Sequence, residues 1–125
     1  EALDISEGML AVAAQKKVYA AFHYEALGEP LSLPSGHFAA VVSTGVFTSG
    51  HVGAEGLDEL IRVTVPNGVI VLTVKDAVWN DGFCARVAQL TEAGKVELVE
   101  ETEPYVSMPG ETGTTPGRAI VLRVH

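Results

Sequence analysis

A nearly unbroken run of aliphatic residues constrains the fold of this chain more than any other feature. Five of the six residues from Val69 to Val74 are aliphatic, and most of these are β-branched. Such a continuous run is typical of a central parallel strand that is buried on both faces. Residues 37–43 have the same character. Parallel strands need crossover helices, so the pattern predicts an α/β fold.

Helical patterns separate the predicted strands. Residues 55–65 place leucines at helical spacing on one face and charged residues on the other, and Pro66-Asn67-Gly68 is expected to end that helix. A later helix is expected to begin at Trp79 and to end at Gly94. Further strands are predicted at 17–24, 96–100 and 119–124, the last two as an antiparallel pair. Continued helix is the alternative for 17–24.

The first ten residues have the pattern of a strand end followed by a helix start. Asp4 follows a short apolar stretch, Ser6 is a suitable N-cap, and Glu7 puts a negative charge in the first helical turn. A carboxylate at the tip of an α/β strand can accept hydrogen bonds from both hydroxyls of a ribose. The alternative is that Asp4 is a second cap or a solvated turn residue. The pattern therefore indicates a candidate nucleotide site.

Composition excludes several classes of function. The formal net charge is −8, and Lys16-Lys17 is the only basic pair, which argues against a nucleic-acid partner. The longest aliphatic stretch, 69–72, is too short to span a membrane. Cys84 is the single cysteine, so an internal disulfide is impossible and a reducing compartment is favoured. A cytoplasmic location is therefore expected.

Other catalytic motifs are weak or absent. The four histidines lack the spacing of metal ligands, so no metal site is predicted. His51 follows a predicted strand and is a candidate general base, although a loop histidine is more often solvated or capping. No G-x-S-x-G elbow and no G-x-G-x-x-G loop occur, which disfavours an α/β-hydrolase and a dehydrogenase-type nucleotide domain.

Three blocks in order resemble the class I S-adenosylmethionine-dependent methyltransferases. They are residues 4–10, residues 31–42, and residues 57–63 with the Pro66-Asn67-Gly68 turn. Residues 28–36 look most similar to the Williams–Beuren-region methyltransferase-like group. The resemblance implies a truncated Rossmann-like sheet, mostly parallel, with a C-terminal antiparallel strand pair and helices on both faces.

The resemblance also implies a cofactor, S-adenosylmethionine, and roles for matching positions. Asp4 would hold the ribose hydroxyls, and Ile5 and Met9 would flank the adenine. These roles agree with the chemistry that the residues around Asp4 suggest on their own.

Two further positions would complete the half-site. Leu27 stands where many family members have an aspartate that contacts the adenine amino group, so Gly28 or a backbone amide would have to replace that contact. Thr44, just past a predicted strand, would line the methionine end of the cofactor. The resemblance leaves the catalytic residues unknown.

The largest departure from the family lies before Asp4. The family's first strand and glycine-rich loop would precede this residue, where only residues 1–3 stand. We therefore expect residues 1–125 to form one incomplete methyltransferase-like domain. Three outcomes are open: a sheet in which the strand at 17–24 closes up beside the strand at 37–43, a homo-oligomer that covers the exposed sheet edge, or a fragment of a longer product.

Two functions from different classes follow. The first is a fragment of a methyltransferase that acts on a small-molecule acceptor, with S-adenosylmethionine binding weakened without the N-terminal segment. The second is a catalytically inactive methyltransferase fold that serves as an oligomerisation or interaction module.

Overall fold

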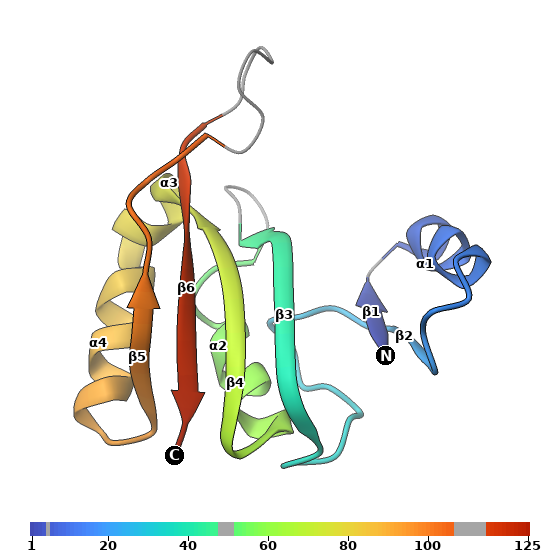
Figure 1. Ribbon diagram of the computed structural model, residues 1–125, viewed down its shortest axis with the longest axis horizontal. Helices are drawn as coiled ribbons and strands as arrows, with labels where there is room; N and C mark the ends of the chain where they lie inside the picture. The colour runs from blue at the N-terminus through green and yellow to red at the C-terminus, as the bar shows by residue number, and fades with distance from the viewer. Residues whose placement is uncertain (5, 48–51, 107–114) are drawn as a thin grey trace.

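Two sheets and a set of short helices make up the fold (Figure 1). The computed structural model describes residues 1–125 apart from 5, 48–51 and 107–114. A four-stranded sheet has the order β3-β4-β6-β5, and a two-stranded sheet pairs β1 with β2. The strands are β1 (Ala2–Asp4), β2 (Phe22–Tyr24), β3 (Phe38–Phe47), β4 (Thr64–Lys75), β5 (Val96–Glu101) and β6 (Gly117–Val124).

Strand directions confirm the predicted α/β fold with a closing antiparallel pair. β1 runs parallel to β2, and β3 runs parallel to β4. β6 is antiparallel to both β4 and β5. The aliphatic run at 69–74 forms the middle of β4, which lies between β3 and β6 as expected for a central strand.

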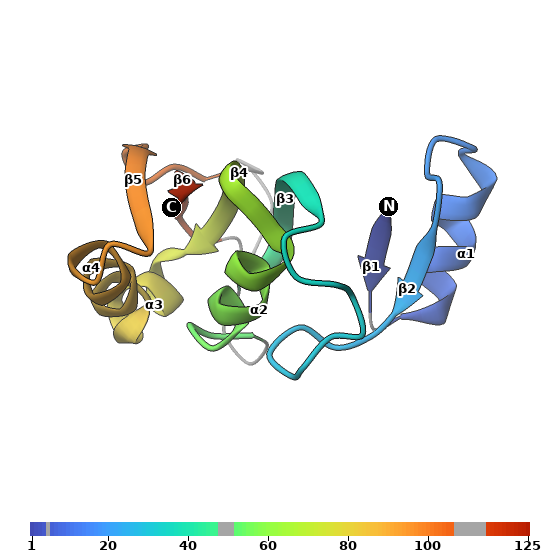
Figure 2. The ribbon, with the colours of Figure 1, turned by 90° about the horizontal axis from the view of Figure 1, so that it is seen from below.

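The family resemblance predicts helices on both faces of the sheet, whereas α2, α3 and α4 lie on one face of the larger sheet, as Figure 2 shows. α1 is separate and contacts β1 and β2. The helical segments are α1 (Glu7–Gln15), α2 (Gly56–Val63), α3 (Asp76–Val78), the irregular turn η1 (Trp79–Phe83) and α4 (Cys84–Glu92). The helix predicted to begin at Trp79 thus starts earlier and is interrupted, because Asp81 and Gly82 leave helical geometry.

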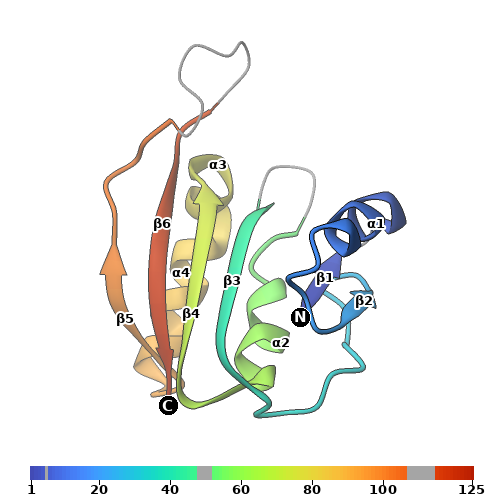
Figure 3. The same ribbon diagram turned by 45° about the vertical axis from the view of Figure 1, so that its right-hand side comes forward.

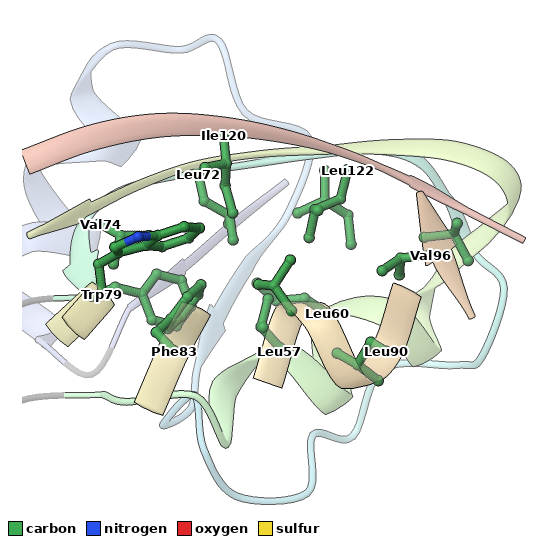
Figure 4. Close-up of a cluster of buried hydrophobic side chains, with 14 residues drawn as sticks. Leu57, Leu60, Leu72, Val74, Trp79, Phe83, Leu90, Val96, Ile120 and Leu122 are labelled. Carbon is green, nitrogen blue, oxygen red and sulfur yellow. The ribbon is translucent and has the colours of Figure 1, made fainter. Parts of the chain in front are cut away.

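The hydrophobic core lies between this sheet face and the helices α2 and α4. Figure 4 shows Leu57 and Leu60 of α2 facing the strand residues Leu72, Ile120 and Leu122. The inward leucine face predicted for residues 55–65 is confirmed, since Leu57 and Leu60 are buried. The other buried hydrophobic residues of the helical segments include Val63, Phe83, Val87 and Leu90. Trp79 is also buried, as expected for a core or helix-entry residue.

The prediction that the strand at 37–43 is buried on both faces is wrong. Val41 packs against the core, but the next residue, Val42, is 71% exposed on the opposite face of β3. The strand is also longer than predicted and continues through Thr44 to Phe47. A continuous aliphatic run shows that both faces of a strand carry apolar side chains. It does not show whether another element covers the second face.

Two element boundaries also differ from the sequence pattern. The second strand is limited to Phe22–Tyr24 rather than 17–24. The helix expected at 55–65 ends at Val63, because Thr64 turns to extended geometry while its hydroxyl donates to the Leu60 carbonyl oxygen at 2.7 Å. The turn expected at Pro66-Asn67-Gly68 lies inside the span of β4. The pairing of β3 with β4 is irregular there, because Phe38 pairs with Thr64 whereas Ala40 pairs with Val69.

The two sheets remain separate among the described residues. β1 and β3 run in the same direction (Figures 1 and 3), yet no ladder of hydrogen bonds joins them. Of the three outcomes left open, the sheet in which the strand at 17–24 closes up beside the strand at 37–43 is therefore not found among the described residues. The small sheet has only three residues in each strand, and α1 buries no residue fully.

We predict that Gly68→Ala destabilises the fold. An added methyl group would lie 2.8 Å from the Val65 carbonyl oxygen and 2.9 Å from the Ala39 carbonyl oxygen, which are backbone atoms that cannot rotate away. The expected loss is about 1–3 kcal/mol in the free energy of unfolding, measured by urea denaturation. Gly8→Ala is the control, because its nearest neighbour would be 3.7 Å away and alanine favours the helix. Equal stability of the two variants would contradict the prediction.

Candidate functional site

The carboxyl ends of β1, β3 and β4 point toward the same side of the molecule (Figures 1 and 3). Ligand crevices in open α/β sheets lie at this side, because loops and helix N-termini collect there. β1 ends at Asp4, and β3 carries Thr44 near its end. The general-base candidate His51 lies outside the described residues, as does Ile5.

Asp4 lies where the sequence predicts it, at the last position of β1. Its Oδ1 accepts a hydrogen bond from the Ser6 amide at 3.0 Å, and the Ser6 hydroxyl caps α1 by accepting from the Met9 amide at 3.2 Å. Asp4 is partly exposed. Its second oxygen, Oδ2, has no hydrogen-bond partner in the part of the chain that the structure describes. The carboxylate is thus oriented by the turn and still able to accept from a ligand.

The other predicted positions lie on separate elements. Met9 is in the first turn of α1 and is 59% exposed, so it is available to a planar ligand. Gly28 has a φ of +104°, which a residue with a side chain rarely adopts. Leu27 packs against the core at the start of α2, and Thr44 is exposed on β3. Their roles toward a cofactor stay predictions.

A clamp on α2 holds the loop at residues 25–37. Glu59 Oε1 accepts from the Leu31 amide at 2.6 Å, while Arg62 Nη2 donates to the Leu31 carbonyl oxygen at 3.1 Å. Arg62 also donates to Ser35 Oγ at 3.0 Å and, through Nε, to Glu59 Oε2 at 2.7 Å. These bonds lower the pKa of Glu59, chiefly through Arg62 and then through the Leu31 amide. No local sequence pattern indicates this clamp, because it joins positions that are 28 and 31 residues apart.

A second carboxylate connects the same loop to Asp4. The Glu25 amide donates to the Asp4 carbonyl oxygen at 3.2 Å. The Glu25 side chain accepts from both the amide and the hydroxyl of Ser32, at 2.8 and 2.7 Å. The Ser32 amide bond and then its hydroxyl bond lower the pKa of Glu25. Asp4 is therefore linked through Glu25 and Ser32 to the clamped Leu31.

Glu1 joins the small sheet to the segment that enters β3. Its carboxylate lies 2.8 Å from His23 Nε2 and 3.8 Å from His37 Nε2. The hydrogen bond to His23 is the main cause of a lowered pKa for Glu1. All three side chains are partly solvent-exposed, which weakens the electrostatic attraction between them.

Another polar cluster lies at the carboxyl end of β4. Arg118 pairs with Asp76 at 3.2 Å and with Glu101 at 2.7 Å, and its guanidinium carbon lies 4.8 Å from the ring centroid of Trp79. Although burial opposes it, the two carboxylate bonds raise the pKa of Arg118. Each charge has a partner, so the cluster is a structural tie between η1 and the antiparallel pair.

Neither a metal-ligand cluster nor a membrane-spanning helix occurs in the described residues. These residues contain no group of three or more histidine, cysteine, aspartate or glutamate side chains that could hold a metal ion. None of their helices has the length and apolar character needed to cross a bilayer.

Comparison with known families gives one family match. A family model described as "Methyltransferase domain" matches residues 1–72, more than half of the chain. The human "Methyltransferase-like protein 27" is 33% identical over 100 residues, which cover 76% of this chain. The chain spans about 40% of the length of that relative. The closer grouping with the Williams–Beuren-region proteins stays a prediction.

Solved structures of methyltransferases share the fold. A SAM-dependent methyltransferase from Methanosarcina mazei superposes with a TM-score of 0.71 at 12% identity, covering 98% of this chain and 80% of that one. The N-methyltransferase NodS from Bradyrhizobium japonicum, in complex with S-adenosyl-L-homocysteine, gives a TM-score of 0.68 at 14% identity, covering 98% and 64%. The Rossmann-like methyltransferase architecture predicted from the sequence is confirmed.

We predict that Glu59→Gln reduces the loss of unfolding free energy that occurs when the pH is lowered. The pKa of Glu59 is lowered below its ordinary value of 4.5 in the folded protein, so the carboxylate contributes stability that is present above 4.5 and lost as the pH falls through the folded value. The variant removes that contribution. Urea midpoints measured between pH 6 and pH 3 should therefore fall less steeply in Glu59→Gln than in the wild type. Parallel curves would contradict this assignment.

Proposed function

We infer the function of this chain from its family, because it belongs to the class I S-adenosylmethionine-dependent methyltransferases. We propose that the protein binds S-adenosylmethionine and takes part in transferring its methyl group to an acceptor. Since the chain spans only part of its human relative, the activity of the whole protein is part of this proposal. The observation that carries it is Asp4, an oriented carboxylate at the tip of β1 beside a capped helix.

The residues around Asp4 fit the nucleoside half of this cofactor. Two vicinal ribose hydroxyls are hydrogen-bond donors, and a carboxylate can accept from both. The exposed thioether of Met9 suits the face of an adenine ring. Leu27, Gly28 and Thr44 would complete the contacts, with Gly28 or a backbone amide facing the adenine edge. Ile5 belongs to the same proposed set.

The cofactor supplies a methyl group on a positively charged sulfur. When bound, it would supply an electrophilic methyl group to a lone pair of the acceptor, and Asp4 and Met9 would hold its nucleoside. Such a donor is already reactive, so the protein's main contribution is to place donor and acceptor in line. The chain's own residues would bind the nucleoside and fix its position.

A small molecule is the proposed acceptor. The net charge of −8 disfavours a nucleic-acid acceptor. A cytoplasmic location is proposed from the single cysteine, which is exposed in the fold. The second candidate function, an inactive interaction module, is favoured by the exposed apolar residues of β3 and β2, such as Val42 and Tyr24.

A homo-oligomer that covers the exposed edge of β3 is also proposed. β3 pairs with β4 on one side, and its other side has no ladder partner among the described residues. Unpaired strand edges favour association with a second chain. Sedimentation equilibrium should give a particle of at least twice the 13.1 kDa chain mass, and Val42→Lys should shift it toward the monomer. A monomer at all concentrations would contradict the proposal.

We predict that Asp4→Ala weakens cofactor binding at least tenfold, because a charged hydrogen-bond acceptor for the ribose is lost. The dissociation constants are measured by isothermal titration calorimetry, with S-adenosylhomocysteine and S-adenosylmethionine titrated into this 125-residue protein. Glu7→Ala is the control, since it removes a nearby carboxylate that is exposed on α1. Equal affinity for wild type and Asp4→Ala would refute the ribose contact. No binding to the wild type at millimolar cofactor would favour the interaction module.

A further inference from the structure

We propose that the Glu59–Arg62 clamp on α2 positions Asp4 for cofactor binding, acting through the loop at residues 25–37. The inference rests on the proposed function, because it assigns these residues a role in the same nucleoside site. Neither clamp residue is expected to touch the cofactor. Each is a positioning residue whose effect reaches Asp4 through hydrogen bonds.

The first step is the fixation of Leu31. Both polar groups of its backbone are bound by the clamp, the amide by Glu59 at 2.6 Å and the carbonyl oxygen by Arg62 at 3.1 Å. The Leu31 side chain is 8% exposed. Glu59 and Arg62 also bind each other, so the carboxylate and the guanidinium hold each other in a fixed geometry. Leu31 is therefore anchored to a helix that belongs to the main core.

The second step runs from Leu31 to Asp4. The next residue, Ser32, gives two hydrogen bonds to the Glu25 carboxylate. The Glu25 amide in turn donates to the Asp4 carbonyl oxygen. Asp4 also pairs with Tyr24 at the end of the β1–β2 ladder. A continuous set of bonds thus connects α2 to the backbone of the proposed ribose-binding residue.

The third step is the weakness of the other attachments. The small sheet has no ladder to β3 among the described residues, and α1 buries no side chain fully. Glu1 also contacts His37, but Glu1 Oε2 and His37 Nε2 are 3.8 Å apart and both side chains are partly exposed. Since little apolar burial holds β1 in place, the orientation of Asp4 relative to the main sheet depends on the clamped loop.

A matched pair on the same helix separates positioning from general stability. Asp58 is the neighbour of Glu59, and it also binds an arginine, Arg86, at 2.9 Å. That bond ties α2 to α4 and does not involve the loop. Asp58→Ala therefore removes an ion pair from α2 without loosening the path to Asp4.

The experiment titrates S-adenosylhomocysteine into the wild type and into Glu59→Ala, Glu59→Gln, Glu25→Gln and Asp58→Ala, each checked for folding by circular dichroism. We expect about tenfold weaker binding for Glu59→Ala. Glu59→Gln keeps an oxygen for the Leu31 amide and should lose less, while Asp58→Ala should bind like the wild type. Folded Glu59→Ala with wild-type affinity, or an equal loss in Asp58→Ala, would overturn the inference.

A double-mutant cycle tests whether the effect passes through Asp4. In an Asp4→Asn background, whose ribose contact is already impaired, Glu59→Ala should weaken binding much less than it does alone. Additive losses would show that Glu59 acts elsewhere and would overturn the inference while leaving the ribose site intact. No binding by the wild type would refute the proposed function and the inference together. Glu59→Gln serves the same cycle if Glu59→Ala does not fold.

Discussion

The packing of α2 and α4 against one face of the four-stranded sheet is the interaction on which the rest of the structure depends. The side chains of this core are fully or almost fully buried, and they come from β3, β4, β5, β6 and the helical segments between them. Burial of this kind supplies most of the favourable free energy of folding. β1, β2 and α1 contribute no buried side chain to it. The molecule thus has a part with a buried core, formed by the four-stranded sheet with α2 and α4, and a part without one, formed by β1, β2 and α1.

The part without a buried core carries Asp4 and Met9 of the proposed cofactor residues, and hydrogen bonds rather than apolar packing hold it to the main sheet. Two carboxylates, Glu59 and Glu25, each accept from a backbone amide of the loop between the sheets. Hydrogen bonds fix distances and directions more narrowly than apolar contacts, but each adds little net stability. Such an arrangement orients a side chain such as Asp4 without anchoring it strongly. A bound ligand that also contacts the main sheet would therefore stabilise the contact between the two parts.

Sequence patterns predicted the features that depend on residues close together in the chain. They did not predict the contacts between residues far apart in the chain. The run at 69–74, the inward leucines of α2 and the Ser6 cap next to Asp4 each depend on neighbours within a few residues, and all three are confirmed. The Glu59–Arg62 clamp joins α2 to a loop about thirty residues away, and an i,i+3 Glu–Arg pair looks like an ordinary solvated helix face. The exposure of Val42 depends on what covers the sheet, which no strand pattern encodes.

The division into two parts bears on how a methyltransferase fold could act here. Methyl transfer from a sulfonium depends chiefly on alignment, so a small displacement of the nucleoside changes the rate strongly. In this fold the proposed nucleoside contacts lie on β1, α1 and the loop after β2, while Thr44 lies on β3 in the other sheet. A cofactor that contacts both would span the separation between the sheets. Its alignment would then depend on the clamp and on whatever pairs with the edge of β3 that has no ladder partner among the described residues, so the proposed binding and the proposed association would be physically coupled.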